Sequence, residues 1–383
     1  MIPPFRMALG ALLAVLLGAA IPVSALAQDD GGAPPAIGPE GDGPYVAPGK
    51  GGWTARSITA DRTAASRAIG KHGKVEIAAV GKVPAFRVGL RAPSGAPAPD
   101  RISLAPDAKL LVLADTHGEY EILVEFLQAQ GVIGKKLEWR FGKGQMVVTG
   151  DMFDRGAHQL EILWLFYKLE GEARKAGGAL HVLLGNHEAM VLRGDLRYLH
   201  PRYGEVARIL GARDYAALFT PETLLGNWLR SRPAVLKLGD LLFLHGGISP
   251  AILDAKLDVP ALNAGIRGPL AVPASETKAM EPGLQLIAGS LGPQWYRGYF
   301  AKGESRTSDA DVERTLAAFG VAKILVGHTV VEKVTPLYGG KVIAVQVYPA
   351  RDKASGAPIL EGALREKGRW FRLTADGARA PLS

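Results

Sequence analysis

The chain has 383 residues, of which 48% are hydrophobic, so it can bury a large core and cannot be disordered throughout. It contains no cysteine, which excludes disulfide bonds, thiolate nucleophiles and zinc sites built on thiolates. The formal net charge of +8 is compatible with anionic substrates, but the basic residues are dispersed and predict no nucleic-acid groove.

The first 27 residues have the features of a secretory signal peptide. Arg6 precedes an apolar run over residues 7–20, and the Ala-Leu-Ala of residues 25–27 places small residues where a signal peptidase cuts. An uncleaved membrane anchor is the alternative, but the run is shorter than the ~20 apolar residues that a membrane span needs. We therefore expect cleavage after Ala27, a periplasmic or secreted protein, and no stable membrane span after cleavage.

Composition divides the rest of the chain into four parts. Residues 28–52 are rich in glycine, proline and aspartate without any period, which is typical of a flexible leader. Residues 53–105 contain short alternating segments between Gly and Pro, and predict a small β-rich N-terminal extension. Strands then alternate with helices, so we place a main domain over 106–350, followed by a C-terminal strand and tail over 351–383.

Three strand-turn-helix units open the main domain. Apolar strands are predicted at residues 110–114, 146–149 and 182–184, and helices with apolar residues at 3.6-residue spacing follow the first two. This succession favours a mixed α/β (α+β) fold in which neighbouring parallel strands have right-handed connections. Ligands of such sheets bind beyond the carboxyl ends of the strands.

The second half of the main domain contains an insertion and further strands. Residues 193–235 predict a mostly helical insertion, rich in arginine and tyrosine, which we interpret as a cap above the strand ends. Strands follow at 241–244 and 324–326, and each ends in glycine and histidine. The last strands, around 342–347 and 370–373, are expected to close a sheet.

Five strand ends carry side chains that bind metal ions. Because the fold brings the strand ends to one crevice, we expect these side chains to converge. Carboxylates, an amide oxygen and imidazoles suit two borderline divalent ions such as Mn, Fe or Zn. The predicted ligands are Asp115, His117 and Asp151 for one ion, and Asp151 as a bridge, Asn186, His245 and His328 for the other.

Two such ions hold and activate a bridging hydroxide for in-line attack on phosphorus, so the pattern predicts phosphoester hydrolysis. Arg155 and Arg297 are candidates to bind phosphate oxygens through their guanidinium groups. His187 is the candidate general acid, and Asp154 is placed to orient its imidazole. The alternatives are a surface ion pair for Asp154 and Arg155, and likewise for Arg297, and a helix cap for Asn186 and His187.

Five short motifs follow one another along the main domain. They are D-x-H-G at 115–118, G-D-x-x-D-R-G at 150–156, G-N-H-E at 185–188, H-G-G at 245–247 and G-H at 327–328. In this order they resemble the signature set of the phosphoprotein phosphatase branch of calcineurin-like metallophosphoesterases, and the resemblance covers about residues 106–350. Residues 186–198 and the W-Y-R-G of 295–298 are also similar to bacterial Shewanella-like phosphatases.

The resemblance implies a metallophosphoesterase β-sandwich flanked by helices, in a four-layer αββα arrangement, with a dinuclear metal site. It also implies removal of phosphate from phosphomonoesters, either in proteins, on phosphotyrosine or phosphoserine/threonine, or in small molecules. Two positions depart from the family pattern. Ala114 stands where glycine is usual, and Val345-Gln346 stands where an acidic residue is common, but neither position is a predicted ligand.

Three other functions compete with this prediction. A phosphodiesterase or a dinucleotide polyphosphate hydrolase can use the same metal site, because the pocket walls choose the substrate. Residues 288–292 have the form of a serine-hydrolase elbow around Ser290, but Pro293 follows where that elbow needs a helix. A non-catalytic protein that binds metal or phosphate is the third, although every ligand and the candidate acid are present.

Overall fold

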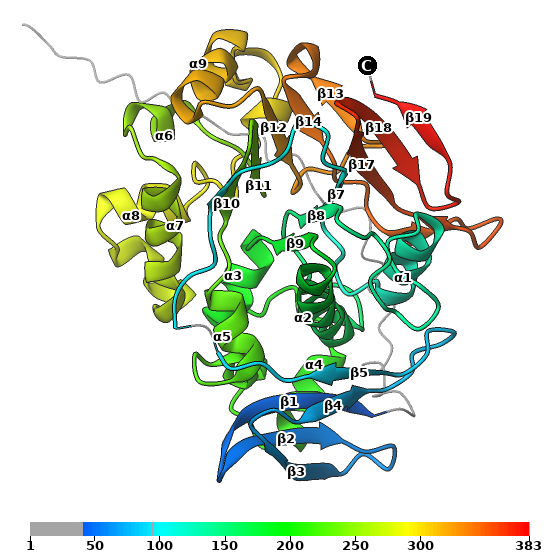
Figure 1. Cartoon of the computed structure of the whole chain (residues 1–383). Coiled ribbons are helices and arrows are strands. Elements are labelled where there is room, and N and C mark those ends of the chain that lie inside the picture. Colours follow the sequence, from blue (N-terminus) through cyan, green and yellow to red (C-terminus); the bar gives the residue numbers. More distant parts are fainter. Residues whose placement is uncertain (1–40, 94, 383) are drawn as a thin grey trace, which may run out of the picture. The chain divides into compact units, whose positions relative to one another are not determined.

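Two six-stranded sheets carry the strands whose ends were predicted to form the site (Figure 1). The computed structural model describes residues 41–93 and 95–382, so the predicted signal peptide and residues 28–40 of the predicted leader lie outside the described residues. The first sheet has the order β19-β18-β17-β7-β8-β9. Its strands are β7 (Leu110–Leu113), β8 (Gln145–Val148), β9 (Ala179–Val182), β17 (Glu361–Glu366), β18 (Arg369–Thr374) and β19 (Arg379–Pro381).

The second sheet has the order β13-β14-β12-β11-β10-β6. Strands β11, β12 and β14 are parallel to one another, and β10 forms an antiparallel pair with β11. The strands are β6 (Arg101–Ile102), β10 (Val235–Leu238), β11 (Leu241–Leu244), β12 (Lys323–Val326), β13 (Thr335–Leu337) and β14 (Val342–Ala344).

Successive side chains of a strand point to opposite faces of the sheet, so each face has its own hydrophobic core. Leu110 and Val112 of β7 pack in one cluster with Phe243 of β11 and Leu325 of β12, so this cluster lies between the two sheets. Leu111 and the other residues of opposite phase pack in a second cluster with the helices. A strand buried on both faces needs a continuous apolar run, which explains the sequence pattern.

Helices cover the outer face of each sheet and complete the predicted four-layer αββα fold (Figure 1). The predicted apolar spacing in α1 is confirmed, because Ile122, Leu123, Phe126 and Leu127 are all buried. The helices of the first sheet are α1 (Tyr120–Ala129) and α2 (Gln159–Lys175), and those of the second are α6 (Pro250–Asp254), α7 (Val259–Arg267), α8 (Pro282–Ala288) and α9 (Asp309–Phe319).

The parallel succession β7-β8-β9 is confirmed, but two predicted boundaries were wrong. The strand predicted around 370–373 is present as β18, but β17 joins it to β7, so the predicted C-terminal segment belongs to the first sheet and residue 350 is no boundary. Strand β6, assigned to the N-terminal extension, pairs with β10 in the second sheet. Both pairings join segments that are distant in the sequence. Two short strands, β15 (Ala350–Arg351) and β16 (Pro358–Ile359), pair with each other.

Part of the segment predicted to be a flexible leader forms a strand of an antiparallel N-terminal sheet. The glycine and proline content of residues 28–52 suggested flexibility, yet Asp42–Gly49 forms β1, in which Tyr45 and Val46 are buried. The burial of these side chains outweighs the low strand propensity of their neighbours. The strands are β1, β2 (Gly52–Ile58) and β3 (Ala64–Gly70), followed by the hairpin β4 (Lys74–Ile77) and β5 (Phe86–Gly89).

The predicted cap has two parts with different neighbours. Its first part contains Tyr198, whose ring lies beside His187, whereas α5 packs against β1 and α4 is joined to the N-terminal sheet. The interpretation of the whole insertion as a cap was therefore wrong for its helices. These are α4 (Arg202–Ile209), η1 (Tyr215–Phe219) and α5 (Leu224–Arg230). Other 3₁₀ helices are η2 (Gly268–Ala271), η3 (Ala274–Ala279), η4 (Gly298–Phe300), η5 (Gly303–Ser305) and η6 (Tyr338–Gly340).

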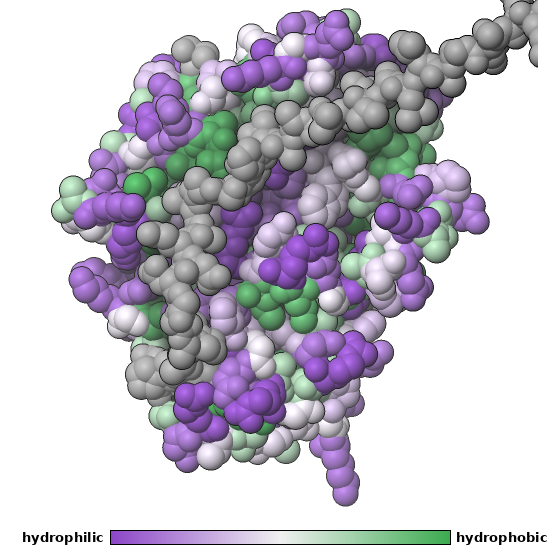
Figure 2. Space-filling model, turned by 180° about the vertical axis from the view of Figure 1, so that it is seen from behind, coloured by the Kyte–Doolittle hydropathy of each residue, from purple (hydrophilic) through white to green (hydrophobic). Residues whose placement is uncertain are grey.

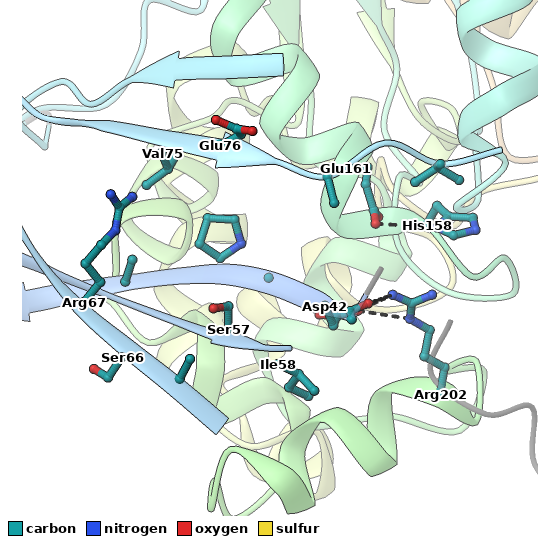
Figure 3. A pocket seen from close by; sticks show the side chains of 17 residues that line it. Asp42, Ser57, Ile58, Ser66, Arg67, Val75, Glu76, His158, Glu161 and Arg202 are labelled. Carbon is teal, nitrogen blue, oxygen red and sulfur yellow. Dashed lines mark hydrogen bonds and ion pairs between the residues drawn. The ribbon is translucent and has the colours of Figure 1, made fainter. Parts of the chain in front are cut away.

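A buried ion pair joins the N-terminal sheet to α4 (Figure 3). The carboxylate of Asp42 accepts hydrogen bonds from Nε and Nη2 of Arg202 at 3.0 and 2.7 Å, and from the Tyr45 hydroxyl at 2.6 Å. The pair lines a cavity of about 350 Å³ that also reaches His158 and Glu161 at the start of α2. Burial raises the pKa of Asp42 to about 6 although Arg202 lowers it.

None of the helices in the described ranges is long and apolar enough to cross a membrane. On the face seen in Figure 2, hydrophilic and hydrophobic residues are interspersed outside the grey atoms. The large hydrophobic side chains that are exposed in the described part are scattered along the chain. They are Tyr198, Leu284, Leu291, Val330 and Ile359.

Removal of the Asp42 carboxylate is predicted to destabilise the protein strongly. Asp42→Ala leaves the Arg202 guanidinium buried without its partner, and this should lower the free energy of unfolding by about 3 kcal/mol. Arg202→Met should cost less, because Asp42 can take up a proton, whereas arginine stays charged. Denaturation by urea measures both. The exposed pair of Arg208 with Glu205 supplies the control Arg208→Ala, and a loss in Asp42→Ala no larger than in this control would contradict the prediction.

Candidate metal centre

The six predicted ligands come together beyond the carboxyl ends of five strands. Each of them is at most 6% exposed. Strands from both sheets contribute, which places the site at one edge of the sandwich. Asp115 and His117 follow β7, Asp151 follows β8, Asn186 begins α3 (Asn186–Leu192) after β9, His245 follows β11 and His328 follows β12.

The backbone at these strand ends is strained. His117, Asp151 and His328 have φ angles of 41°, 55° and 62°, in the left-handed region that non-glycine residues rarely adopt. Such strain persists where the surrounding structure enforces it, and it is common at active sites. Gly185 makes the crowding possible, because a Cβ on it would lie 2.1 Å from Oδ1 of Asp151. Gly185 therefore lets the turn after β9 approach Asp151 closely.

Asp151 belongs to two groups of metal-binding atoms. Its Oδ2 lies 2.9 Å from Nε2 of His245, and Nδ1 of His328 lies 3.2 Å from that same nitrogen. These three residues form one group whose ligand atoms all lie within 4.8 Å of one another. The second group within that distance consists of Asp151, His117 and His187.

The second group differs from the predicted ligand set, which has Asp115 in place of His187. Nε2 of His117 lies 3.8 Å from Oδ2 of Asp115 and 3.8 Å from Oδ2 of Asp151, so Asp115 is within reach of the same ion. Nε2 of His187 also lies 3.8 Å from Oδ2 of Asp151. Distances alone therefore leave both residues as candidates, and their hydrogen bonds distinguish them.

Hydrogen bonds to backbone carbonyls fix which nitrogen of each ligand histidine is free. Nδ1 of His117 is 2.9 Å from the Phe153 oxygen, and Nδ1 of His245 is 3.0 Å from the Thr149 oxygen. A carbonyl only accepts, so these nitrogens carry the proton and Nε2 keeps its lone pair. In His328, Nε2 faces the Trp295 oxygen at 3.1 Å, which leaves Nδ1 free. Histidine ligands of metals typically donate their other N–H in this way.

Asn186 supplies an independent test of whether a metal fits. Its Oδ1 is buried without a hydrogen-bond partner, while its Nδ2 lies 3.9 Å from the sulfur of Met190. A buried amide oxygen without a partner is costly unless a ligand satisfies it. Together with the carboxylates and imidazoles it forms a donor set that suits a borderline divalent ion.

The electrostatics of the site also favour a bound cation. Burial lowers the pKa of His117 to about 3 and lowers that of His328, so both imidazoles are neutral, as metal ligands must be. Burial also lowers the pKa of His245, but the charges of Asp151 and Asp115 raise it to about 9. Two buried carboxylates therefore attract positive charge to this position.

His187 has the hydrogen bonds of a proton donor. Its Nδ1 lies 2.5 Å from Oδ2 of Asp154, and its ring Nε2 faces Asp151. Burial lowers the pKa of His187, but the charge of Asp151 and the hydrogen bond with Asp154 raise it above its ordinary value. Nδ1 of His187 thus pairs with a carboxylate, whereas Nδ1 of His117 and of His245 pairs with a backbone carbonyl. On this difference we favour Asp115 as the third member of the second group.

Glu188 holds the two central turns together. This buried carboxylate accepts hydrogen bonds from the backbone N–H groups of Asp151 at 2.8 Å, Met152 at 2.7 Å, Phe153 at 3.2 Å and Gly185 at 2.8 Å. The bond from Gly185 also caps α3, so Asn186 and His187 are not needed as caps. Glu188 thus positions the loop that carries Asp151.

Both predicted arginines lie at the exposed rim of the site. Nη1 of Arg297 donates to the His328 oxygen at 2.8 Å and to the Thr329 hydroxyl at 3.0 Å. The guanidinium of Arg155 lies 5.7 Å from the centre of the Tyr348 ring. Asp154 pairs with His187, so the alternative of a surface ion pair with Arg155 is not what the structure shows.

Three aromatic rings surround the histidines. Tyr198 lies in the segment predicted to be a cap above the strand ends, and no role was predicted for Trp295 or Tyr348. The ring of Tyr198 lies 5.4 Å from His187, that of Tyr348 lies 5.9 Å from His117, and that of Trp295 lies 5.9 Å from His328. Tyr198 and Trp295 occur in the motifs quoted above. Tyr348 could have been found from the sequence, because it follows β14 closely and β14 ends at the same edge of the sheet as β12.

The serine-hydrolase alternative lacks its required geometry. Ser290 follows helix α8 and not a strand, so it cannot stand on a strand-to-helix elbow. The two departures from the family pattern leave the ligands in place. Ala114 is buried behind Asp115, and Gln346 is buried with an Nε2 that has no hydrogen-bond partner.

Comparisons with known proteins agree with this geometry. The model of the calcineurin-like phosphoesterase family matches residues 108–332. A cold-active protein-tyrosine phosphatase of a psychrophilic Shewanella species has a similar structure, with a TM-score of 0.79 and 36% identity, over 90% of this chain and 100% of that chain. Shewanella-like protein phosphatase 2 of Arabidopsis thaliana is 24% identical, over 68% of this chain and 76% of that protein.

A symmetrical bis(5'-nucleosyl)-tetraphosphatase of Cronobacter sakazakii is 28% identical over 48% of this chain, which matches 56% of that protein. The family model covers more than half of the chain, and its match includes every predicted ligand. The chain belongs to the calcineurin-like phosphoesterase family, and it is a metallophosphoesterase whose buried histidine and aspartate groups suit a divalent metal ion.

Proposed function

We propose that this metallophosphoesterase is a protein phosphatase that removes phosphate from phosphotyrosine residues. The observation that carries the proposal is the shared position of Asp151 between two groups of buried ligand atoms, beside the pair of His187 and Asp154. Metal binding and proton donation are the two functions that phosphomonoester hydrolysis requires.

The proposed ligands of one ion are Asp115, His117 and Asp151, and those of the other are Asp151, Asn186, His245 and His328. Mn, Fe or Zn suits this set. When bound, two such ions lower the pKa of a water molecule and stabilise the charge that develops in an in-line displacement at phosphorus. Glu188 keeps the Asp151 loop fixed, so that the carboxylate faces both groups.

The remaining residues act on the phosphate and the leaving group. In our proposal, Nε2 of His187 gives its proton to the oxygen that leaves phosphorus, while Asp154 holds the opposite nitrogen and stabilises the imidazolium. Arg155 and Arg297 lie at the rim, where their guanidinium groups can bind the equatorial oxygens of the phosphate.

The substrate class rests on the relatives. The structurally similar Shewanella enzyme is a protein-tyrosine phosphatase, and the Arabidopsis relative is a protein phosphatase. Phosphoserine or phosphothreonine in proteins and small phosphomonoesters are the nearest other substrates. The similarity to the tetraphosphatase favours a dinucleotide polyphosphate as the second candidate, because the metal site is shared and the walls of the pocket choose the substrate.

A substrate panel tests the proposal. Purified protein should hydrolyse a phosphotyrosine peptide with a higher kcat/KM than a phosphoserine peptide, p-nitrophenyl phosphate or a dinucleoside tetraphosphate. A chelator should abolish this activity, and Mn²⁺ should restore it, because the buried donors cannot do the chemistry alone. Ser290→Ala is the control and should keep full activity. A preference for the tetraphosphate would support the second candidate, and bound metal without any turnover would contradict both.

The decrease in kcat on replacement of His187 should depend on the leaving group. His187→Ala is predicted to lower kcat for an alkyl phosphate or a phosphotyrosine peptide by about 10²–10⁴-fold, with a much smaller loss for p-nitrophenyl phosphate, whose leaving group needs no proton. Asp154→Asn should show the same trend with smaller losses. His158→Ala, a histidine at the start of α2, is the control. Equal losses across all leaving groups would rule out the proton-donor role.

A further inference from the structure

Tyr198 combines exposure with a fixed position beside the proposed proton donor. Its side chain is 49% exposed, in the segment between α3 and α4, and its ring centre lies 5.4 Å from that of His187. Its backbone oxygen accepts a hydrogen bond from the N–H of Arg155 at 3.0 Å. The main chain at Tyr198 is thereby tied to the loop that carries Arg155 and Asp154.

One charged side chain lies beside the ring without covering it. The guanidinium of Arg197 lies 5.9 Å from the ring centre, and this arginine is paired with Asp195 at 2.5 Å. An exposed tyrosine ring has few rotatable bonds, so it offers contact area at a small cost in conformational entropy. The ring is therefore suited to contact a ligand.

The position of His187 indicates which part of a substrate would contact the Tyr198 ring. This step rests on the proposed function. A general acid must come within hydrogen-bond distance of the oxygen it protonates. The group attached to the leaving oxygen therefore lies next to the His187 ring, where Tyr198 stands. In phosphotyrosine an aromatic ring is bonded directly to that oxygen, whereas phosphoserine places a single methylene there.

A neighbouring cavity leaves room for the rest of a peptide substrate. It has a volume of about 590 Å³, and its lining includes Arg197, which precedes Tyr198 in the sequence, Asp195, and Met190, which contacts Asn186. Trp295, whose ring lies 5.9 Å from His328, lines it as well. The cavity thus lies beside residues that contact two of the proposed ligands and beside the segment that carries Tyr198.

We propose that Tyr198 forms the wall of a leaving-group subsite that takes an aryl ring and sets the preference for aryl over alkyl phosphomonoesters. Two aromatic rings in contact attract each other more than their buried area alone implies, whereas a methylene gains little from the same wall. Tyr198 is then a residue that determines specificity, and the metal ligands are unaffected by its replacement.

The test compares two peptides of one sequence that carry phosphotyrosine or phosphoserine at the same position. Tyr198→Ala should lower the ratio of their kcat/KM values by about tenfold, and Tyr198→Phe, which keeps the ring, should preserve the ratio. Ile359→Ala, which truncates an exposed side chain on β16, is the control and should also preserve it. An unchanged ratio in Tyr198→Ala, or an equal change in Tyr198→Phe, would overturn the proposal.

Binding of inhibitors separates this inference from the proposed function. Benzylphosphonate and ethylphosphonate cannot be hydrolysed, so calorimetry gives their Kd values for the metal-loaded protein whether or not it is a phosphatase. Wild-type protein should bind benzylphosphonate more tightly, and Tyr198→Ala should lose about tenfold of that preference. If neither peptide is hydrolysed but the binding preference behaves as stated, the proposed function fails and the subsite stands. Equal affinities of the wild type for the two phosphonates would overturn the subsite.

Discussion

The buried carboxylate of Asp151 is the constraint on which the rest of the site depends. One of its oxygens lies 2.9 Å from His245, and the other accepts the backbone N–H of His187 at 3.0 Å. A carboxylate buried among apolar strands is unstable unless cations and donors surround it. Three features fix the position of this charge. They are the left-handed backbone at Asp151, the absence of a side chain at Gly185, and the four backbone N–H groups that donate to Glu188.

The two-sheet architecture explains how so many donors reach one point. Strands β7, β8 and β9 of one sheet and β11 and β12 of the other end at the same edge, and the core between the sheets keeps these ends in register. Each donor follows a rigid strand closely, so its position is held more precisely than it would be on a long loop. The rim of the site differs from its buried centre, because Arg155, Arg297 and Tyr198 are exposed and can contact a substrate.

The resemblance to the phosphoesterase family implied the four-layer fold. The residues that converge were predicted from the strand pattern, because the carboxyl ends of parallel strands share one edge of a sheet. Sequence reasoning missed features that depend on contacts between distant segments. Strand β17 returns to pair with β7, β1 is stabilised by burial of Tyr45 and by the ion pair of Asp42, and Tyr348 arrives beside His117 from the end of the second sheet. Sequence spacing also could not show that His187 lies as near to Asp151 as His117 does. Only the hydrogen bond between His187 and Asp154 separates the proposed proton donor from the proposed ligand.

The central claim is that Asp151 lies between two metal ions. Anomalous scattering from crystals of manganese-loaded protein tests it most directly. We predict two peaks per chain, one among Asp115, His117 and Asp151 and the other among Asp151, Asn186, His245 and His328, with His187 outside both coordination shells. A single peak, or a peak bound by His187 in place of Asp115, would contradict the account.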